Sequence, residues 1–507
     1  MVADARAAGR HHMKTKRKNR IFVVGAGFAG TSIARELRTK GILGVIAAFL
    51  DDDPTKIGKS IDGIPVLGPI ADVANLLEKS PSDEALIAIP SGSREKLKRI
   101  YAILEHAGFS RIRILPAISQ IIEADPHFIQ TREIDPQDLL GRTPIRINLR
   151  QSLSYLRGKR VLISGAGGSI GSELSRQLLS GGAERLYLLG HGENSIYEID
   201  HELRLLQEEG VGEKAQIVPI IGELQDRDYV MFLLKRLRAD VVFHTAAHKH
   251  VPMTETNPVG AVQNNVFGTR NLVDAAAASG VRRFVLISTD KVVDPVSVYG
   301  ASKRLAEEIV LSRSTKRQEF MVVRFGNVLA SRGSIIPLFR RQILKGGPVT
   351  VTDPKMSRYF MTIPEASSLV LQAGGVGEGG TLYLLDMGEA LLIKDLAEQM
   401  IRFYGFVPGD EIPITYIGAR PGEKLSETLV GSDETAVDTE YQRLRRVNRN
   451  GSAAALRAHL SEALAALEPI CFYDPANEAW YRNRHRLREV LRTYVPTVMV
   501  PSDEPEY

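Results

Sequence analysis

The chain contains 507 residues, of which 44% are apolar and 25% charged. This composition is typical of a soluble globular protein, and the length favours two to four domains. A single cysteine, Cys471, excludes an intramolecular disulfide and a zinc site built on several cysteines, and it is typical of a reducing compartment. We expect no metal site, because His248 and His250 lack a third ligand nearby in the sequence.

The net charge of +5 comes from the amino-terminal segment. Residues 1–20 hold seven lysines and arginines against one acid, Asp4, and carry +6, so the remaining chain carries −1. A nearly neutral body excludes the basic face of a nucleic-acid-binding protein. We predict that residues 1–20 form a disordered basic tail, with weak contact to anionic lipid headgroups as the alternative.

The sequence shows neither a secretory signal nor a membrane-spanning helix. The basic residues are not followed by the apolar core of a signal peptide. The longest apolar stretch, residues 41–50, is much shorter than the roughly 20 residues that a spanning helix needs. These observations predict a cytoplasmic protein without a transmembrane span.

Residues 21–130 are predicted to form a Rossmann-like nucleotide-binding module. The segment RIFVVGAGFAGTSIARELRTKG reads as a strand, a loop with Gly25, Gly27 and Gly30, and a helix. Asp51 follows at the distance expected of a ribose-binding acid. Two interpretations stay open: a second nucleotide or nucleotide-sugar site, or a degenerate module that serves assembly.

The same order of elements returns after a polar linker, which we assign to residues 131–157. The segment KRVLISGAGGSIGSELSRQLLSGG again combines strand, glycine loop and helix, and short apolar strands alternate with helical stretches after it. We assign residues 158–470 to a catalytic domain with a small substrate-binding part, and residues 471–507 to a C-terminal extension. The predicted fold class is α/β, with two successive doubly wound parallel sheets.

The second glycine loop is predicted to bind a dinucleotide. Glycines let the backbone approach a diphosphate, and the N-terminus of the next helix offers N–H donors. Residues 189–193 stand where a ribose-binding acid is expected, but they show no Asp at the strand end and no Arg, so NAD and NADP both stay open. The expected cofactor contacts are Gly165, Gly168, Ser169, Ile170, Gly171, Ala246, Tyr299 and Lys303.

Two pairs of ionisable residues lie in the segment ISTDKVVDPVSVYGASKR. Tyr299 and Lys303 are four residues apart and share one face of a predicted helix. Asp290 and Lys291 follow the apolar run FVLIS. Each pair has an ordinary alternative interpretation. Tyr299 and Lys303 could lie on the surface of any amphipathic helix, and Asp290 and Lys291 could form a surface ion pair. Their place between a strand and a helix favours a catalytic site.

Eight motifs are similar to those of one known family: SGAGGSIG, HTAAHKHVPMTETNP, NNVFGT, STDK, YGASK, RFGNVLASRGSIIPLF, GGPVTVTDPKMSRYFMTIPEA and RPGEKL. In this order they resemble the CapD-like polysaccharide-biosynthesis proteins, which are UDP-N-acetylglucosamine 4,6-dehydratases of the extended short-chain dehydrogenase superfamily. Long members usually begin with several membrane-spanning helices, so this chain resembles their cytoplasmic part alone.

The resemblance implies a reaction that uses both pairs. Oxidation of C4 of the sugar makes the C5 proton acidic, water leaves across C5 and C6, and the hydride returns to C6. Tyr299 with Lys303 would take the C4 hydroxyl proton. By resemblance Asp290 is the acid to the C6 hydroxyl and Lys291 the base at C5, with Thr289 assisting by hydrogen bonds. We expect Lys303 to lower the pKa of Tyr299 from about 10, and burial beside Lys303 to lower the pKa of Lys291.

The expected substrate contacts lie in the later motifs. A diphosphate favours planar, permanently charged donors, and an amide can add to them. The residues are Asn327, Arg332, Arg358 and Arg420. Tyr299 departs from many long members of the family, which have Met there, whereas shorter C5-inverting relatives keep Tyr. Retention or inversion at C5 therefore stays open.

The predicted function is a nucleotide-sugar 4,6-dehydratase for surface polysaccharide or glycan biosynthesis. It would act on UDP-N-acetylglucosamine or a similar UDP-hexose with a tightly bound, recycled NAD or NADP, and we expect a homo-oligomer. A UDP-hexose 4-epimerase is the alternative enzyme, since it needs only Tyr299, Lys303 and the cofactor. Superfamily epimerases carry small residues in place of Asp290 and Lys291, which favours dehydration. A non-catalytic dinucleotide-sensing regulatory protein is the alternative outside enzymes.

Overall fold

The computed structural model describes residues 20–40, 45–76, 83–89, 94–109, 111–114, 132–133, 153–329, 331, 333–403, 406–450, 453–501 and 504. The predicted basic tail apart from Arg20, most of the predicted linker, and Arg332 lie outside these residues. The chain divides into two compact units, residues 1–141 with 403–405, and residues 142–402 with 406–507.

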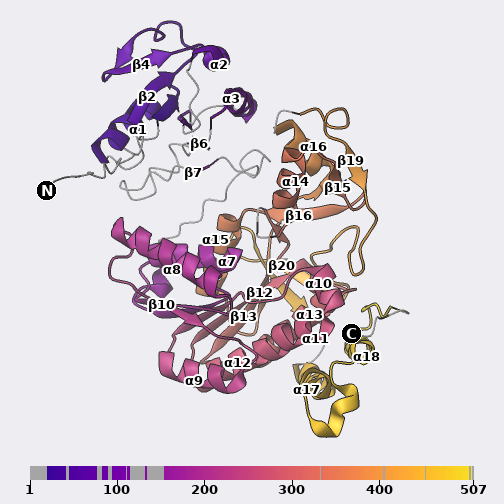
Figure 1. Cartoon of the computed structure of the whole chain (residues 1–507). Coiled ribbons are helices and arrows are strands. Elements are labelled where there is room, and N and C mark those ends of the chain that lie inside the picture. Colours follow the sequence, from indigo (N-terminus) through magenta and orange to yellow (C-terminus); the bar gives the residue numbers. More distant parts are fainter. Residues whose placement is uncertain are drawn as a thin grey trace, which may run out of the picture. The chain divides into compact units, whose positions relative to one another are not determined.

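The first unit contains a seven-stranded sheet in the order β3-β4-β2-β1-β5-β6-β7 (Figure 1). Its five central strands are parallel, while β3 and β7 run antiparallel at the two edges. The strand β1 has the sequence RIFVV and is buried after its first residue, as expected of a central parallel strand. The elements are β1 (Arg20–Val24), α1 (Phe28–Lys40), β2 (Val45–Leu50), β3 (Ser60–Ile61), β4 (Ile64–Leu67), α2 (Val73–Leu76), β5 (Glu84–Ile87), α3 (Arg94–His106), β6 (Arg111–Ile114) and β7 (Arg132–Glu133).

The second unit contains a nine-stranded sheet in the order β10-β9-β8-β11-β12-β13-β17-β21-β20. The seven strands from β10 to β17 are parallel, and β21 and β20 are antiparallel additions at one edge. The strands are β8 (Arg160–Ser164), β9 (Arg185–Gly190), β10 (Gln216–Ile221), β11 (Val241–His244), β12 (Arg283–Thr289), β13 (Glu319–Phe325), β17 (Leu382–Leu385), β20 (Glu434–Asp438) and β21 (Leu444–Arg449). Two doubly wound sheets were predicted, and both are confirmed.

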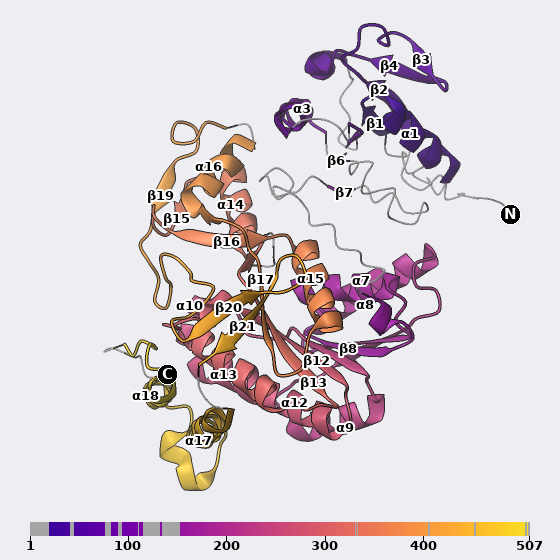
Figure 2. The ribbon, with the colours of Figure 1, turned by 180° about the vertical axis from the view of Figure 1, so that it is seen from behind.

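Helices cover both faces of this sheet (Figures 1 and 2). Neighbouring strand residues point to opposite faces, so Leu162 and Val242 belong to one buried core and Ile163 and Phe243 to the other. The first core is covered by α9 (Arg227–Leu237), α12 (Thr269–Ala278) and α13 (Val298–Ser312). The second is covered by α7 (Ser169–Ser180), α8 (Glu193–Glu208) and α15 (Ile363–Val376).

Smaller elements complete the second unit. β14 (Asn327–Val328), β16 (Ser357–Met361) and β18 (Ala390–Leu392) form one small sheet, and β15 (Val349–Val351) pairs with β19 (Ile414–Tyr416). The remaining helices are α10 (Val251–Thr256), α11 (Pro258–Val262), α14 (Ile335–Leu344), α16 (Ile393–Phe403), α17 (Ala453–Cys471) and α18 (Arg484–Tyr494). Leu467 and Leu487 pack into the core beneath α12 and α13. The boundary predicted at residue 471 therefore falls at the end of a helix that shares this core.

Candidate functional site

The second glycine loop joins β8 to α7 in a tight turn. Gly165 has a φ of +71°, and a Cβ there would lie 2.7 Å from the backbone nitrogen of Ala246. A Cβ on Gly171 would clash with the carbonyl oxygen of Gly165. Both positions therefore require glycine, and the N-terminal turn of α7 begins directly after Gly168.

The catalytic segment begins where β12 ends. Thr289 closes this strand, and its hydroxyl accepts from the backbone N–H of Lys291 at 3.4 Å, which starts the short 3₁₀ helix η4 (Asp290–Val292). Ser297 caps α13 by accepting from Gly300 N at 3.1 Å. A Cβ on Gly300 would clash with the Lys291 carbonyl oxygen, so the glycine of YGASK lets the two segments meet.

A cavity of about 950 Å³ opens at this edge of the sheet. The carboxyl ends of β12 and β13 line it, together with residues that follow β8 and β11. This edge is the usual position of a ligand site in a parallel sheet. The walls contain most of the predicted site residues: Gly168, Ser169, Ile170, Thr289, Lys291, Tyr299, Lys303, Asn327, Arg358 and Arg420. Asp290 is fully buried and touches the wall through Lys291.

Lys291 is surrounded by oxygen atoms. Its Nζ lies 3.0 Å from Asp290 Oδ1, 3.0 Å from Asn327 Oδ1 and 3.5 Å from Glu427 Oε1. Burial acts to lower the pKa of Lys291, but Asp290 and Glu427 outweigh burial and raise it. The expectation that burial beside Lys303 lowers this pKa is therefore wrong: two carboxylates hold the ammonium charged.

Tyr299 is buried in the wall of the cavity, with 7% of its surface exposed. Burial raises the pKa of its phenol to about 12, although the Lys291 ammonium and the Thr289 hydroxyl act against this shift. The sequence predicted a lowered pKa caused by Lys303. That prediction is wrong because burial outweighs the cations, and the cation with the largest effect on Tyr299 is Lys291.

Lys303 does carry a lowered pKa. Its Nζ donates to the carbonyl oxygen of Ile287 at 2.8 Å, and the side chain reaches the cavity. Burial lowers the pKa of Lys303 to about 8, while Glu307, one helical turn later, acts in the opposite direction. The charge of this lysine can therefore change within the working range of an enzyme.

The predicted diphosphate ligands differ in how they are held. Arg358 donates to the carbonyl oxygens of Ser357, Lys424 and Leu425 at 2.7, 2.7 and 3.1 Å, so most of its donors are used by the backbone. Arg420 is half exposed and pairs with Glu423 at 2.6 Å. Both line the cavity, as does Asn327.

Sequence reasoning missed Glu427. Its side chain is 3% exposed, lines the cavity and lies between Lys291 and Arg358, whose Nε is 3.8 Å away. The Oε2 atom of Glu427, like Oδ2 of Asp290, is buried and has no hydrogen-bond partner in the described part of the chain. The only sequence signal was the place of Glu427 two residues after RPGEKL.

The first glycine loop is built in the same way but uses its acid differently. Gly25 has a φ of +102°, and a Cβ on Gly30 would clash with the Gly25 carbonyl oxygen, whereas Gly27 faces open space. The carboxylate of Asp51 accepts from the backbone N–H of Ala26 at 2.7 Å and of Asp53 at 2.9 Å. Asp51 therefore holds the loop, and a nucleotide site there stays a prediction.

Two further expectations concern absences. Among the described residues, no group of three or more His, Cys, Asp or Glu side chains is arranged to hold a metal ion. Every helix within the same ranges is too short or too polar to cross a bilayer.

Comparisons with known proteins agree with these observations. The family described as "Polysaccharide biosynthesis protein" matches residues 161–449, and one described as "CoA-binding domain" matches residues 3–116. The chain is 43% identical to the probable polysaccharide biosynthesis protein EpsC of Bacillus subtilis, over 84% of this chain and 71% of that protein. It is 41% identical to the capsular polysaccharide biosynthesis protein CapD of Staphylococcus aureus, over 85% and 71%.

Relatives named as enzymes of two reaction types are also similar to part of this chain. An inverting UDP-N-acetylglucosamine 4,6-dehydratase of Campylobacter jejuni is 29% identical over 56% of this chain and 81% of its own length. A UDP-glucose 4-epimerase of Rickettsia canadensis is 38% identical, over 42% and 62%. The crystal structure of Pen from Bacillus thuringiensis has a TM-score of 0.53 at 32% identity and covers 61% of this chain and 99% of its own.

Proposed function

Because the chain belongs to the polysaccharide biosynthesis protein family, we propose that it is an NAD(P)-dependent 4,6-dehydratase of UDP-N-acetylglucosamine or a similar UDP-hexose. The observation that carries this proposal is that Lys291 and Tyr299 line one cavity and that the buried Asp290 lies 3.0 Å from Lys291 Nζ. C4 oxidation needs one base, and elimination of water needs a further base and an acid. Two such groups in the cavity wall, with a carboxylate beside one of them, fit both steps.

The glycine loop fits the dinucleotide. Gly165 and Gly171 let the loop fold back on itself, and the N-terminus of α7 at Ser169 borders the cavity, where backbone N–H groups favour a diphosphate. Lys303 would donate to the nicotinamide ribose from the other side. When bound, the cofactor supplies a reversible acceptor for the hydrogen removed from C4.

Tyr299 would take the proton of the C4 hydroxyl. Its raised pKa makes the phenol hard to ionise beforehand but makes the phenolate a strong base once formed. The Lys291 ammonium stabilises that phenolate, because it is the cation that most lowers the pKa of Tyr299. C4 oxidation therefore depends on the charge of Lys291 as well as on Tyr299.

Elimination needs the opposite state of Lys291. Transfer of one proton over the 3.0 Å from Lys291 Nζ to Asp290 Oδ1 converts the ion pair into a neutral amine and a carboxylic acid. The amine then takes the C5 proton, and the acid gives its proton to the C6 hydroxyl, which leaves as water. Lys291 and Asp290 are then back in their charged forms. When the hydrogen from C4 returns to C6, C5 takes up one proton, and Tyr299 would give it the proton that it took from the C4 hydroxyl, so the cycle closes without a net change in protons.

The substrate diphosphate would lie near the β14–β16 side of the cavity. Asn327 already accepts from Lys291 through Oδ1, which leaves its amide N–H₂ group as a donor. Arg420 is exposed enough to exchange Glu423 for a phosphate. Arg358 would act mainly by holding the segment of Glu427, because the backbone uses most of its donors.

A UDP-hexose 4-epimerase is the second candidate, since Tyr299, Lys303 and the cofactor suffice for it and an epimerase is among the similar proteins. Mass spectrometry of UDP-N-acetylglucosamine incubated with the purified protein separates the two. Loss of one water is expected for the dehydratase. An unchanged mass with a new C4 epimer would select the epimerase.

A further inference from the structure

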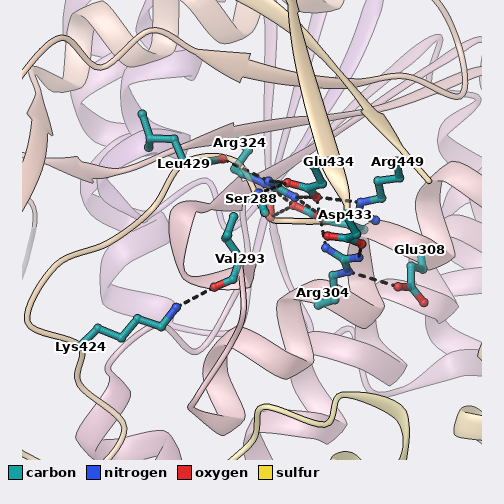
Figure 3. Close-up of polar contacts among 12 residues, drawn as sticks. Ser288, Val293, Arg304, Glu308, Arg324, Lys424, Leu429, Asp433, Glu434 and Arg449 are labelled. Atoms are coloured by element: carbon teal, nitrogen blue, oxygen red, sulfur yellow. Dashed lines mark hydrogen bonds and ion pairs between the residues drawn. The ribbon is translucent and has the colours of Figure 1, made fainter.

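A cluster of buried charges lies beneath the catalytic segment, within the second unit (Figure 3). Arg324 of β13 is fully buried and pairs with two fully buried carboxylates, Glu307 at 3.0 Å and Glu434 at 2.7 Å. Arg449 of β21 pairs with the same two carboxylates. Burial opposes the charge of Glu307, but Arg324 and Arg449 outweigh burial and lower its pKa.

The cluster joins parts of the chain that are distant in sequence. Arg304, next to Lys303 in α13, pairs with Glu434 at 3.1 Å and with Asp433 at 2.9 Å (Figure 3). The edge strands β20 and β21 are thereby tied to α13. Removal of any one member would destabilise the fold, because it would leave a buried charge without a partner.

The cluster also reaches the catalytic strand. Ser288, the residue before Thr289, donates to Glu307 Oε1 at 2.6 Å. Lys303 lies one helical turn before Glu307 on α13. Burial lowers the pKa of Lys303, and the Glu307 carboxylate acts against that shift. One carboxylate thus contacts the strand that ends at Thr289 and supports the cation that faces the cavity.

The segment that carries Glu427 is held by the same cluster. Arg324 donates to the carbonyl oxygen of Leu429 at 3.3 Å, and Glu434 accepts from the N–H of Gly431 at 3.0 Å. At its other end Lys424 donates to the carbonyl oxygen of Val293, just beyond η4, at 2.7 Å (Figure 3). Both ends of residues 424–434 are therefore fixed.

We propose that Glu307 is a positioning residue of this enzyme, which keeps Lys303 charged and holds the end of β12 in place, and that β20 and β21 serve catalysis by fixing Glu307. The other groups around Lys303 do not replace this carboxylate. The Ile287 carbonyl oxygen accepts from its Nζ, and His244 of β11 is fully buried. Burial and Lys303 lower the pKa of His244 to about 3, so this imidazole is neutral.

The test compares Glu307→Gln with Glu308→Gln. Glu308 is the neighbouring residue on α13 and also pairs with Arg304, but it lies outside the contacts to Ser288 and Arg324. NADH or NADPH affinity is measured by fluorescence titration from acid to alkaline pH. In the wild type, affinity should fall as pH rises past about 8, because Lys303 loses its charge.

Glu307→Gln should move this fall about one pH unit lower, giving roughly tenfold weaker binding near pH 9 and little change near pH 6. Glu308→Gln should keep the wild-type profile. A Glu307→Gln variant that binds the reduced cofactor with the wild-type pH profile would overturn the proposal.

Glu307→Gln leaves Arg324 with one carboxylate partner fewer, so thermal unfolding of this variant is measured first. If the variant has lost its fold, a second variant tests the role of Glu307. Ser288→Ala removes the hydrogen bond between β12 and Glu307 and keeps every ion pair. It should slow turnover about tenfold without moving the pH at which cofactor affinity falls, as expected for a lost positioning contact. Turnover equal to the wild type would contradict the claim that Glu307 holds β12.

This inference rests on the proposed binding of NAD(P), but not on the identity of the reaction. If the wild type binds the reduced cofactor and does not dehydrate UDP-N-acetylglucosamine, the proposed reaction fails and the comparison of Glu307→Gln with Glu308→Gln still decides the role of Glu307.

Discussion

The two glycine loops show how similar local structure can serve different purposes. In both loops a buried strand leads into a glycine with a positive φ, and a helix follows. The third glycine of each loop packs against the first. The acid after the first loop, Asp51, holds that loop by accepting from the backbone N–H of Ala26, and it also accepts from the N–H of Asp53. The second loop borders a cavity whose walls all come from the second unit.

The glycine motif therefore identifies a nucleotide-type fold, but it does not show where the reactive groups lie. In the second unit the reactive groups follow β12 and begin α13, on the carboxyl edge shared with the loop. Removing a reactive group, removing a loop glycine, and removing the acid of the first loop should therefore have decreasing effects on activity.

The largest effect is expected from Tyr299→Phe. The change keeps the buried ring and removes the proposed C4 base, so turnover should fall about 10²–10⁴-fold. Tyr187→Phe is a matched control, because this buried tyrosine of β9 donates to the Leu237 carbonyl oxygen away from the cavity. Single-turnover absorbance of the reduced nicotinamide is the measurement. A normal burst in Tyr299→Phe would remove Tyr299 from the mechanism.

A matched pair of glycine variants tests the comparison directly. Gly171→Ala and Gly30→Ala each place a Cβ against the carbonyl oxygen of the first glycine in its loop. Gly171→Ala should weaken cofactor binding and turnover by about 10²-fold, because the loop can no longer close. Gly30→Ala should leave both unchanged. Equal losses in the two variants would mean that the first loop also takes part in catalysis.

A smaller effect is expected from Glu427→Gln. Loss of this carboxylate removes one of the two charges that raise the pKa of Lys291, so the pKa should fall. Lys291 then loses its proton at lower pH, so the acid limb of the pH profile for C5–H exchange should move to lower pH. Solvent deuterium incorporation at C5 measures it. If the acid limb does not move, Asp290 alone raises the pKa of Lys291.

The smallest effect on turnover is expected from Asp51→Ala. The variant loses two hydrogen bonds from backbone N–H groups and should destabilise the first unit by about 1–3 kcal/mol. Hydrogen exchange should rise in residues 20–76 and stay unchanged in residues 153–329, with normal dehydration. A fall in dehydration that matches the change in exchange would show that the second unit depends on the first.

Much of this molecule was predictable from the sequence because its signals are local. Strand, glycine loop and helix follow one another within about 20 residues, and the spacing of Tyr299 and Lys303 sets their common helix face. Family resemblance identified Asp290 and Lys291. Lys291 lines the same cavity as Tyr299, and the buried Asp290 lies 3.0 Å from Lys291 Nζ.

The charge states were not predictable, because they depend on groups brought together by the fold. Tyr299 and Lys291 were both expected to have lowered pKa values. Lys291 instead lies beside Glu427, which is 136 positions further along the chain, and burial dominates at Tyr299. Neither effect is visible in a short motif. The prediction for Arg332 lies outside the described residues and stays a prediction.

The central claim is that one cavity oxidises C4, removes water and returns the hydrogen to the same sugar. It is tested most directly with UDP-N-acetylglucosamine that carries deuterium at C4, incubated with the purified protein and analysed by mass spectrometry and NMR. The account predicts a product that has lost one water, carries the deuterium at C6 and leaves no net reduced cofactor. Deuterium that returns to C4 without loss of water, or that accumulates on reduced cofactor, would contradict it.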